Sequence, residues 1–215
     1  QTNIVFSADA LGRFSTLAGR NLGGAAEATV VATVSPLDGM FDVLLNATTR
    51  DLAVDIPQLD PVLAGTGEVS LQAVRDTTGT RVNNLRLSTP EATVTADADI
   101  TSGVSTGQFD ASLRNVGLVV AGLDGPAQVR GTADSDDQGN VNFDVTGSGP
   151  ATTFSAKGAV NASDEGQTVN ATVNAAITDL SVYNTISKQD LAGAADVTVN
   201  AVLLSDMTRY SAQID

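Results

Sequence analysis

The residues that could carry chemistry in this 215-residue chain are carboxylates, hydroxyls and glycines, because the sequence contains neither histidine nor cysteine. That composition excludes thiolate nucleophiles, imidazole acid–base pairs and Cys/His zinc sites within the chain. Asp134 and Asp136, followed by Gln138 and Gly139, have the spacing of the first half of a calcium loop. The bidentate glutamate expected at the twelfth position is Val145 instead. We therefore interpret this loop as a solvated hairpin turn.

Two glycine-rich stretches also lack the context that their chemistry needs. Gly65-Thr66-Gly67 is not followed by a lysine or placed between a strand and a helix, as a phosphate-binding loop requires. Gly147-Ser148-Gly149 lacks the spacing of a nucleophile elbow and has no histidine base. Paired carboxylates could still meet in space, but most acids fall in turns or on polar strand faces. We expect no enzyme activity, no metal and no cofactor.

Acidic residues outnumber basic residues 25 to 11, which gives a net charge of −14. Such a surface repels phosphate backbones and anionic headgroups, so we expect neither nucleic-acid binding nor electrostatic docking on membranes. No apolar run approaches the ~20 residues of a transmembrane helix. The chain opens on a pattern typical of a strand, so we expect a fragment whose targeting signal or anchor lies outside it.

The elements that must position any site are organised by a phrase that occurs four times, beginning at Leu22, Leu63, Leu123 and Leu191. Each copy reads Leu-x-Gly, two small or turn-forming residues, a polar residue and an apolar one. The glycine predicts a turn at positive φ just before a strand. The first and last copies, with the residues before them, align at a shift of 169 residues. This repetition predicts an array with approximate units 1–62, 63–122, 123–190 and 191–215.

Apolar residues alternate with Thr, Asp, Asn or Ser through most of the chain, which is typical of antiparallel strands with one wet face. Leu11, Phe14 and Leu17 instead follow helical spacing, as do the apolar residues of 180–186. Aromatic residues make up only 4% of the chain, which favours thin sheet layers over a thick core. The strands are expected at 4–6, 26–34, 41–47, 52–56, 69–73, 85–87, 92–100, 109–113, 127–133, 141–145, 154–160, 169–177, 197–203 and 210–214.

The dry faces of these strands must contact something. In a sandwich they would pack on each other, whereas a long sheet curled on itself would leave a furrow. The sequence pattern alone leaves both arrangements open, because Ala and Val pack well in either one.

The four phrases, the short helix at 180–186 and the strand start at 190–199 resemble the repeats of the TamB family, within the wider AsmA-like group. The resemblance covers essentially the whole chain. It implies an all-β fold, an elongated, mostly antiparallel sheet curled into an open hydrophobic groove (a β-taco), with short helical turns between repeats. It also implies a periplasmic location in a diderm bacterium and an inner-membrane anchor outside this fragment. The family carries no active-site residues to transfer.

In function, the resemblance implies phospholipid transport between the inner and outer membranes, support of outer-membrane protein assembly, and an outer-membrane barrel partner of the TamA type. On this hypothesis the apolar stripe faces phospholipid acyl chains. Its expected members are Ala92, Val94, Ala96, Ala98, Phe109, Leu113, Phe143, Phe154, Val169, Val173 and Val199.

Two alternatives belong to other functional classes. One is a structural or adhesive surface β-repeat domain, whose dry faces would close on each other. The other is a chaperone-like scaffold, whose exposed edges would pair with unfolded strands of outer-membrane barrels. Blocking hydrogen bonding at the strand edges would abolish the chaperone-like activity and leave lipid binding intact.

Overall fold

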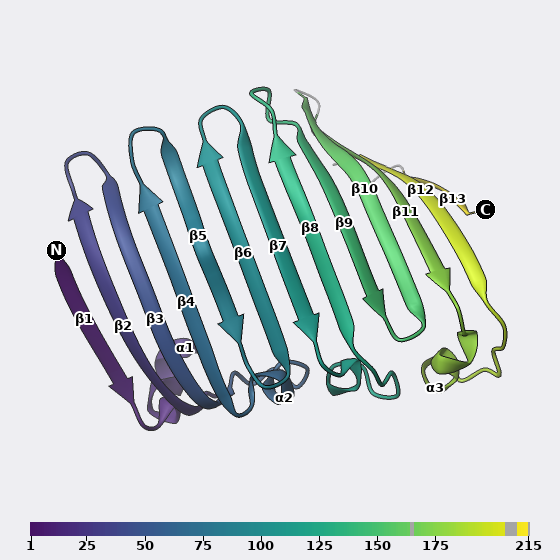
Figure 1. The fold of residues 1–215 in the computed structure, drawn as a ribbon, viewed down its shortest axis with the longest axis horizontal. Coiled ribbons are helices and arrows are strands. Elements are labelled where there is room, and N and C mark those ends of the chain that lie inside the picture. Colours follow the sequence, from purple (N-terminus) through teal and green to yellow (C-terminus); the bar gives the residue numbers. More distant parts are fainter. Residues whose placement is uncertain (164–165, 205–209, 215) are drawn as a thin grey trace.

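The protein, in a computed structural model that describes residues 1–163, 166–204 and 210–214, forms one open sheet of 13 strands (Figure 1). Every strand is hydrogen-bonded to its neighbour in sequence, and all twelve pairings of the described strands are antiparallel. The predicted all-β, repetitive antiparallel fold is confirmed. The strands are β1 (Thr2–Ala8), β2 (Gly23–Ser35), β3 (Met40–Ala53), β4 (Thr66–Arg75), β5 (Gly79–Ser88), β6 (Ala92–Thr101), β7 (Ser105–Leu113), β8 (Ala127–Ser135), β9 (Val141–Gly149), β10 (Thr152–Ser163), β11 (Gly166–Ile177), β12 (Ala195–Leu204) and β13 (Tyr210–Ile214).

The helices are single turns, and all of them lie at the same edge of the sheet, the lower one in Figure 1. We call it the helical-turn edge, and the opposite one, where 36–39, 76–78, 102–104 and 136–140 reverse the chain, the hairpin edge. Among the described residues, no helix has the length and hydropathy to span a membrane. The helical turns are η1 (Leu11–Phe14), α1 (Ser15–Ala18), α2 (Asp60–Leu63), η2 (Val116–Leu118), η3 (Leu180–Tyr183) and α3 (Asn184–Ser187).

Alternation along the strands divides the sheet into two faces, because successive side chains point to opposite sides. Ala96 on β6 lies opposite Leu85 on β5 and Phe109 on β7, whereas its neighbour Thr95 lies opposite Arg86 and Asp110. We call the side that carries Ala96 the apolar face and the side that carries Thr95 the polar face. The register keeps this division from β1 to β12.

A β-bulge keeps β5 in phase with this division. Val82 pairs with Ala98 and Leu85 pairs with Ala96, so two residues of β5, 83 and 84, lie opposite one residue of β6. Asn84 takes φ 54° and donates its backbone N–H to the Asp97 side chain at 2.8 Å. Without this extra residue, Val82 and Leu85 would point to opposite faces. The bulge therefore preserves the apolar face where the sequence alternation is broken.

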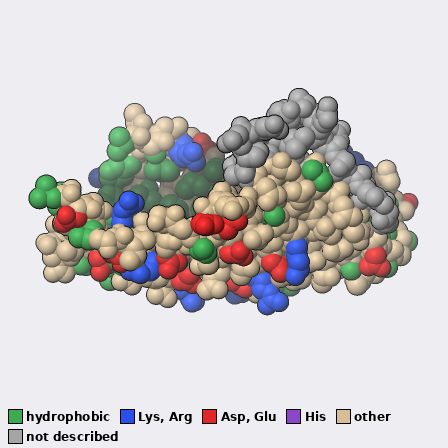
Figure 2. Space-filling model, turned by 90° about the horizontal axis from the view of Figure 1, so that it is seen from above, with side chains coloured by type: hydrophobic (Ala, Val, Ile, Leu, Met, Phe, Trp, Pro, Cys, Tyr) green, Lys and Arg blue, Asp and Glu red, His purple; other side chains and the backbone are tan. Residues whose placement is uncertain are grey.

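The sheet is a single layer with almost no conventional core. Of the side chains whose burial the structure describes, only Ala8 and Val62 are buried apolar residues, each 9% exposed, and none is fully buried. Figure 2 shows hydrophobic side chains gathered in a hollow on one side of the curled sheet, with charged side chains along the opposite side. Among the described residues, no second sheet covers the apolar face. The closed sandwich left open by the sequence pattern is therefore not the arrangement found.

The repeat predicted from the sequence is confirmed in detail between the first and last helical turns. η1 and η3, and likewise α1 and α3, have bounds that differ by the same 169 residues as the phrases. Ser15 Oγ accepts the backbone N–H of Leu22 at 2.9 Å, and Asn184 Oδ1 accepts that of Leu191 at 2.7 Å. These equivalent bonds fix the same turn in both copies.

The phrase glycines take the backbone conformation that their position predicts. All four have positive φ: Gly24 85°, Gly65 82°, Gly125 129° and Gly193 91°. The phrases introduce β2, β4, β8 and β12, so the intervals between them hold two, four and four strands. This count explains why the phrases are unevenly spaced.

One local expectation differs from the structure, and one element was not expected. The short strand expected at 52–56 is not separate, because β3 continues to Ala53 and its end is kinked at Asp51 (φ 49°). The apolar patch at 116–120 forms the 3-10 turn η2, which the sequence pattern does not predict. In that turn the Asn115 side chain accepts the backbone N–H of Gly117 at 2.9 Å. A capping Asx residue was the signal available in the sequence.

Candidate functional site

The structure places all eleven residues of the expected stripe on the apolar face. Ala92 pairs with Leu113, Ala96 with Phe109 and Val173 with Val199 across neighbouring strands. All of them are half-buried except Phe109, which is 40% exposed. Their contact with acyl chains stays a prediction. The register places the remaining five stripe residues on the same face: Val94, Ala98, Phe143, Phe154 and Val169.

The apolar face is continuous in the direction that crosses the strands. One row of register partners runs through the middle of the sheet with no polar side chain in it. Neighbouring strands are about 4.8 Å apart, so 13 strands extend about 57 Å. The row contains Ile4, Val30, Leu45 and Leu71 and, beyond the bulge between β4 and β5, Leu85, Ala96, Phe109, Gly131, Val145, Ala156, Val173 and Val199.

Three phenylalanine rings on the apolar face lie over glycines of the next strand. A Cβ added to Gly131 would lie 2.7 Å from the Phe109 ring, and one on Gly158 would lie 2.6 Å from the Phe143 ring. A Cβ added to Gly147 would lie 2.5 Å from the Phe154 ring. Each ring thus occupies the space that a side chain would take on the neighbouring strand. The rings cover the sheet instead of standing up from it, which leaves the groove unobstructed.

The exposure of the apolar face changes along the strands. On β1, Ile4 is 55% exposed, Phe6 is 40% exposed and Ala8 is 9% exposed, from the hairpin edge toward the helical-turn edge. The Phe14 ring of η1 lies 5.8 Å from the Phe6 ring between centroids, at 57°. The helical turn therefore covers one end of the apolar face and leaves the other end open.

The polar face offers a different kind of surface. One hollow of about 670 Å³ lies over β1–β5, and its lining includes the charged side chains Glu27, Glu68 and Arg86 together with Val5. Lys157 pairs with Asp144 at 2.7 Å on the same face. Charged and hydroxyl side chains lie among the apolar ones here, so this side is a poorer surface for a hydrocarbon chain.

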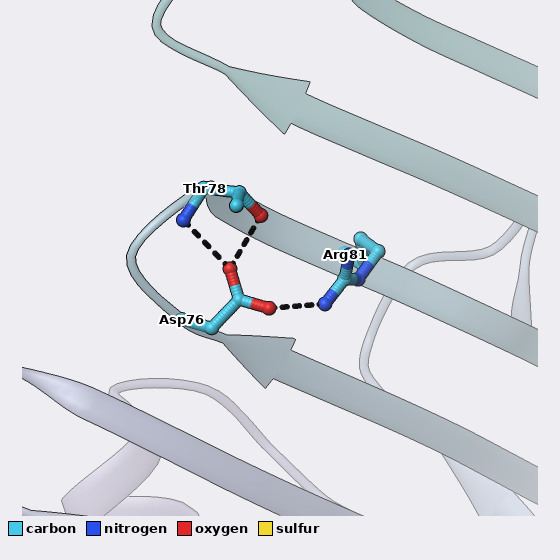
Figure 3. Close-up of polar contacts among 3 residues, drawn as sticks. All are labelled: Asp76, Thr78 and Arg81. Carbon is cyan, nitrogen blue, oxygen red and sulfur yellow. Dashed lines mark hydrogen bonds and ion pairs between the residues drawn. The ribbon is translucent and has the colours of Figure 1, made fainter.

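The carboxylates of the turns are engaged by their own backbone. Asp76 accepts both the hydroxyl and, at 2.8 Å, the backbone N–H of Thr78, and it pairs with Arg81 (Figure 3). The Thr78 hydroxyl, then its N–H, and the Arg81 charge hold the Asp76 pKa at about 2, below the usual 3.8. The Ser181 hydroxyl and N–H similarly lower the pKa of Asp179 at the start of η3.

The calcium-like spacing falls in the turn between β8 and β9, as the hairpin interpretation predicts. Asp136 accepts the backbone N–H groups of Gln138 and Asn140, each at 2.9 Å, and the Asn140 side chain at 2.8 Å. The Asn140 side chain and N–H lower the Asp136 pKa most. No group of three or more acidic residues in the described part of the chain is arranged to hold a metal ion.

Comparison of the chain with models of protein families, with curated proteins and with solved structures finds no match. The resemblance to the TamB family therefore stays a prediction. In its geometry, the candidate site is a continuous apolar face, open at one end and backed by a charged polar face.

Proposed function

We propose that the apolar face binds the acyl chains of phospholipids and guides them along the sheet. The observation that carries the proposal is the apolar row from β1 to β12, which no second layer covers among the described residues. An isolated pocket would hold one ligand in place. A continuous face lets a hydrocarbon chain move from strand to strand without entering water.

The free energy of transferring an acyl chain out of water supports this role. Burying one CH₂ group is worth about 0.8 kcal/mol, so a 16-carbon chain in water costs on the order of 12 kcal/mol. Methyl and methylene groups of Val, Ala, Leu and Phe can replace membrane hydrocarbon around such a chain. The row through Ala96 has no hydrogen-bonding side chain whose desolvation would oppose binding.

From the TamB-like resemblance, the wider setting of the proposal is the periplasm of a diderm bacterium. There the protein would bridge the inner and outer membranes, support outer-membrane protein assembly and contact a barrel partner of the TamA type. The structural alternative is supported less well, because it requires dry faces that close on each other. The chaperone-like alternative requires a strand edge as the active surface, and it becomes one outcome of the test.

The test compares two aspartates on adjacent positions of β11. Val173→Asp places a charge on the apolar face, and Asn174→Asp places the same charge on the polar face, where Asn174 Oδ1 accepts the Thr198 hydroxyl at 3.0 Å. Transfer of fluorescent phospholipid between vesicles should fall at least tenfold for Val173→Asp and stay unchanged for Asn174→Asp. Equal transfer by both variants, with normal circular dichroism, would refute the proposal and favour edge pairing as the activity.

A further inference from the structure

The two edges of the sheet differ in how their connections are held. At the helical-turn edge, the connections bond to one another. Asn21 donates to Asp55 at 3.2 Å, joining the connections before β2 and β4, and Thr89 donates to the carbonyl of Val62 at 2.8 Å. The Arg114 N–H then donates to the carbonyl of Glu91 at 2.8 Å.

The same chain of contacts continues to the last repeat. The Tyr183 hydroxyl of η3 donates to the carbonyl of Pro150 at 3.1 Å. A Cβ added to Gly122, in the connection before β8, would lie 2.6 Å from Thr185 Cγ2 on α3. All six connections at this edge are therefore linked, and we call them the belt: 9–22, 54–65, 89–91, 114–126, 150–151 and 178–194.

The belt folds over the apolar face. Phe14 contacts Phe6, and the Tyr183 hydroxyl hydrogen-bonds Thr152, which shares its face with Phe154. The two buried apolar residues of the described chain, Ala8 and Val62, both lie at this edge. Side chains there are shielded from water on the side where a ligand would lie.

The hairpin edge has the opposite character. Two apolar-face side chains near it are open to solvent, with Val34 59% and Ile100 53% exposed. Described turns bond within themselves, as the Ser35 hydroxyl does to Asp38 at 2.7 Å, and the Ser105 N–H also donates to Ser135 Oγ at 3.0 Å between neighbouring hairpins. Along β2–β9, where the hairpins are described, the apolar face is therefore closed at the belt and accessible at the hairpin edge.

The strands are long enough to hold an acyl chain lengthwise. β6 has 10 residues and is about 33 Å long. The hydrocarbon core of a bilayer is about 30 Å thick, so the chains of one leaflet extend about 15 Å. A chain that enters from the hairpin edge would end about halfway along the strand, well before the belt.

We propose that phospholipids bind with their acyl chains parallel to the strands, chain ends toward the belt and headgroups in water at the hairpin edge. This inference rests on the proposed function and adds the orientation of its ligand. Lipids would then move sideways from strand to strand, keeping one headgroup side throughout. The hairpin edge becomes the rim along which headgroups travel.

The test uses single cysteines, since the chain has none of its own. Ile100→Cys and Ala92→Cys lie on the apolar face at opposite ends of β6, eight residues apart, and Thr95→Cys is the control on its polar face. Each full-length chain carries a fluorophore on its cysteine. It is mixed with vesicles of phosphatidylcholine, unlabelled or bearing a nitroxide on the headgroup or near the end of an acyl chain.

The headgroup nitroxide should quench the label at position 100 at least threefold more than the label at 92, and the chain-end nitroxide should reverse that order. The reverse pattern, or equal quenching of both labels by both lipids, would overturn the orientation while leaving lipid binding in place. Quenching only at position 95, or at none of the three, would refute the proposed function itself. Vesicles without nitroxide correct for changes in fluorescence caused by binding alone.

Discussion

At the scale of single residues, the groove depends on glycines that make room for phenylalanine rings. In Gly158→Ala, the new methyl group would meet the Phe143 ring at 2.6 Å and lie even closer to the carbonyl oxygen of Asn170. We expect a loss of about 1–3 kcal/mol in the free energy of unfolding, because the carbonyl cannot move without breaking the ladder. Urea denaturation measures the loss.

The matched control for this substitution is Gly107→Ala, also on the apolar face in the interior of a strand. Its added methyl group would meet only the carbonyl oxygen of Asp97, at an ordinary 3.7 Å. We expect a change within about 0.5 kcal/mol. A similar loss in both variants would show that the cost comes from replacing a strand glycine as such, and not from the contacts with the Asn170 carbonyl and the Phe143 ring.

The Asp76 turn gives a prediction on pH. Its folded-state pKa of about 2 lies below the ordinary 3.8, so the charged form stabilises the β4–β5 hairpin. That contribution is complete above about pH 4 and is lost as the pH falls through about 2. An NMR titration of the Asp76 carboxyl carbon should have its midpoint near 2. Thr78→Ala should raise this midpoint, and an unchanged midpoint would exclude the Thr78 hydroxyl as the main cause.

At the scale of elements, the repeated helical turns should respond alike to equivalent substitutions. Ser15→Ala and Asn184→Ala each remove the side-chain acceptor of the next phrase's leucine N–H. We expect each to cost about 1 kcal/mol in the free energy of unfolding, measured in urea, because a half-buried N–H loses a partner. Thr16→Ala, on the exposed side of α1, should have no effect. Losses for Ser15→Ala and Asn184→Ala that differ by more than about 1 kcal/mol would contradict the equivalence of the two turns.

Alternation and turn residues were enough to predict most elements. The pattern at 92–100 predicted β6 within a residue of its bounds, and the spacing of Leu11, Phe14 and Leu17 predicted the first helical turns. The bulge in β5 was not predicted, because an extra residue opposite Asp97 depends on the neighbouring strand. Its signal was the odd spacing between Val82 and Leu85 around an Asn-Asn pair.

The sequence predicted which residues share the apolar face, but it did not predict the shape of the site on that face. Period-two alternation assigned all eleven stripe residues to one side, since a strand fixes that side locally. The belt that closes one end depends on bonds between distant connections, such as Thr89 to Val62. The overlay of Phe143 on Gly158 likewise requires the register. Neither is encoded within a single strand.

At the scale of the whole molecule, net charge should influence which lipids approach. With −14 on the chain, anionic phosphatidylglycerol is repelled and zwitterionic phosphatidylethanolamine is not. We expect transfer of the anionic lipid to be about tenfold slower at ~10 mM salt, where the Debye length is about 30 Å. At ~150 mM salt the Debye length falls to about 8 Å, and the difference in transfer rate between the two lipids should largely disappear. A preference that does not change with salt would point to headgroup contacts.

The central claim is that the apolar face of the intact sheet holds acyl chains, and photo-crosslinking in cells tests it most directly. A photoreactive residue replaces Val94, Phe154 or Val173 on the apolar face. Controls replace their neighbours Thr95, Ser155 and Asn174, which point to the polar face. The account predicts labelled phospholipid on the first set alone. No lipid on that set, or equal labelling of both sets in the folded protein, would contradict it.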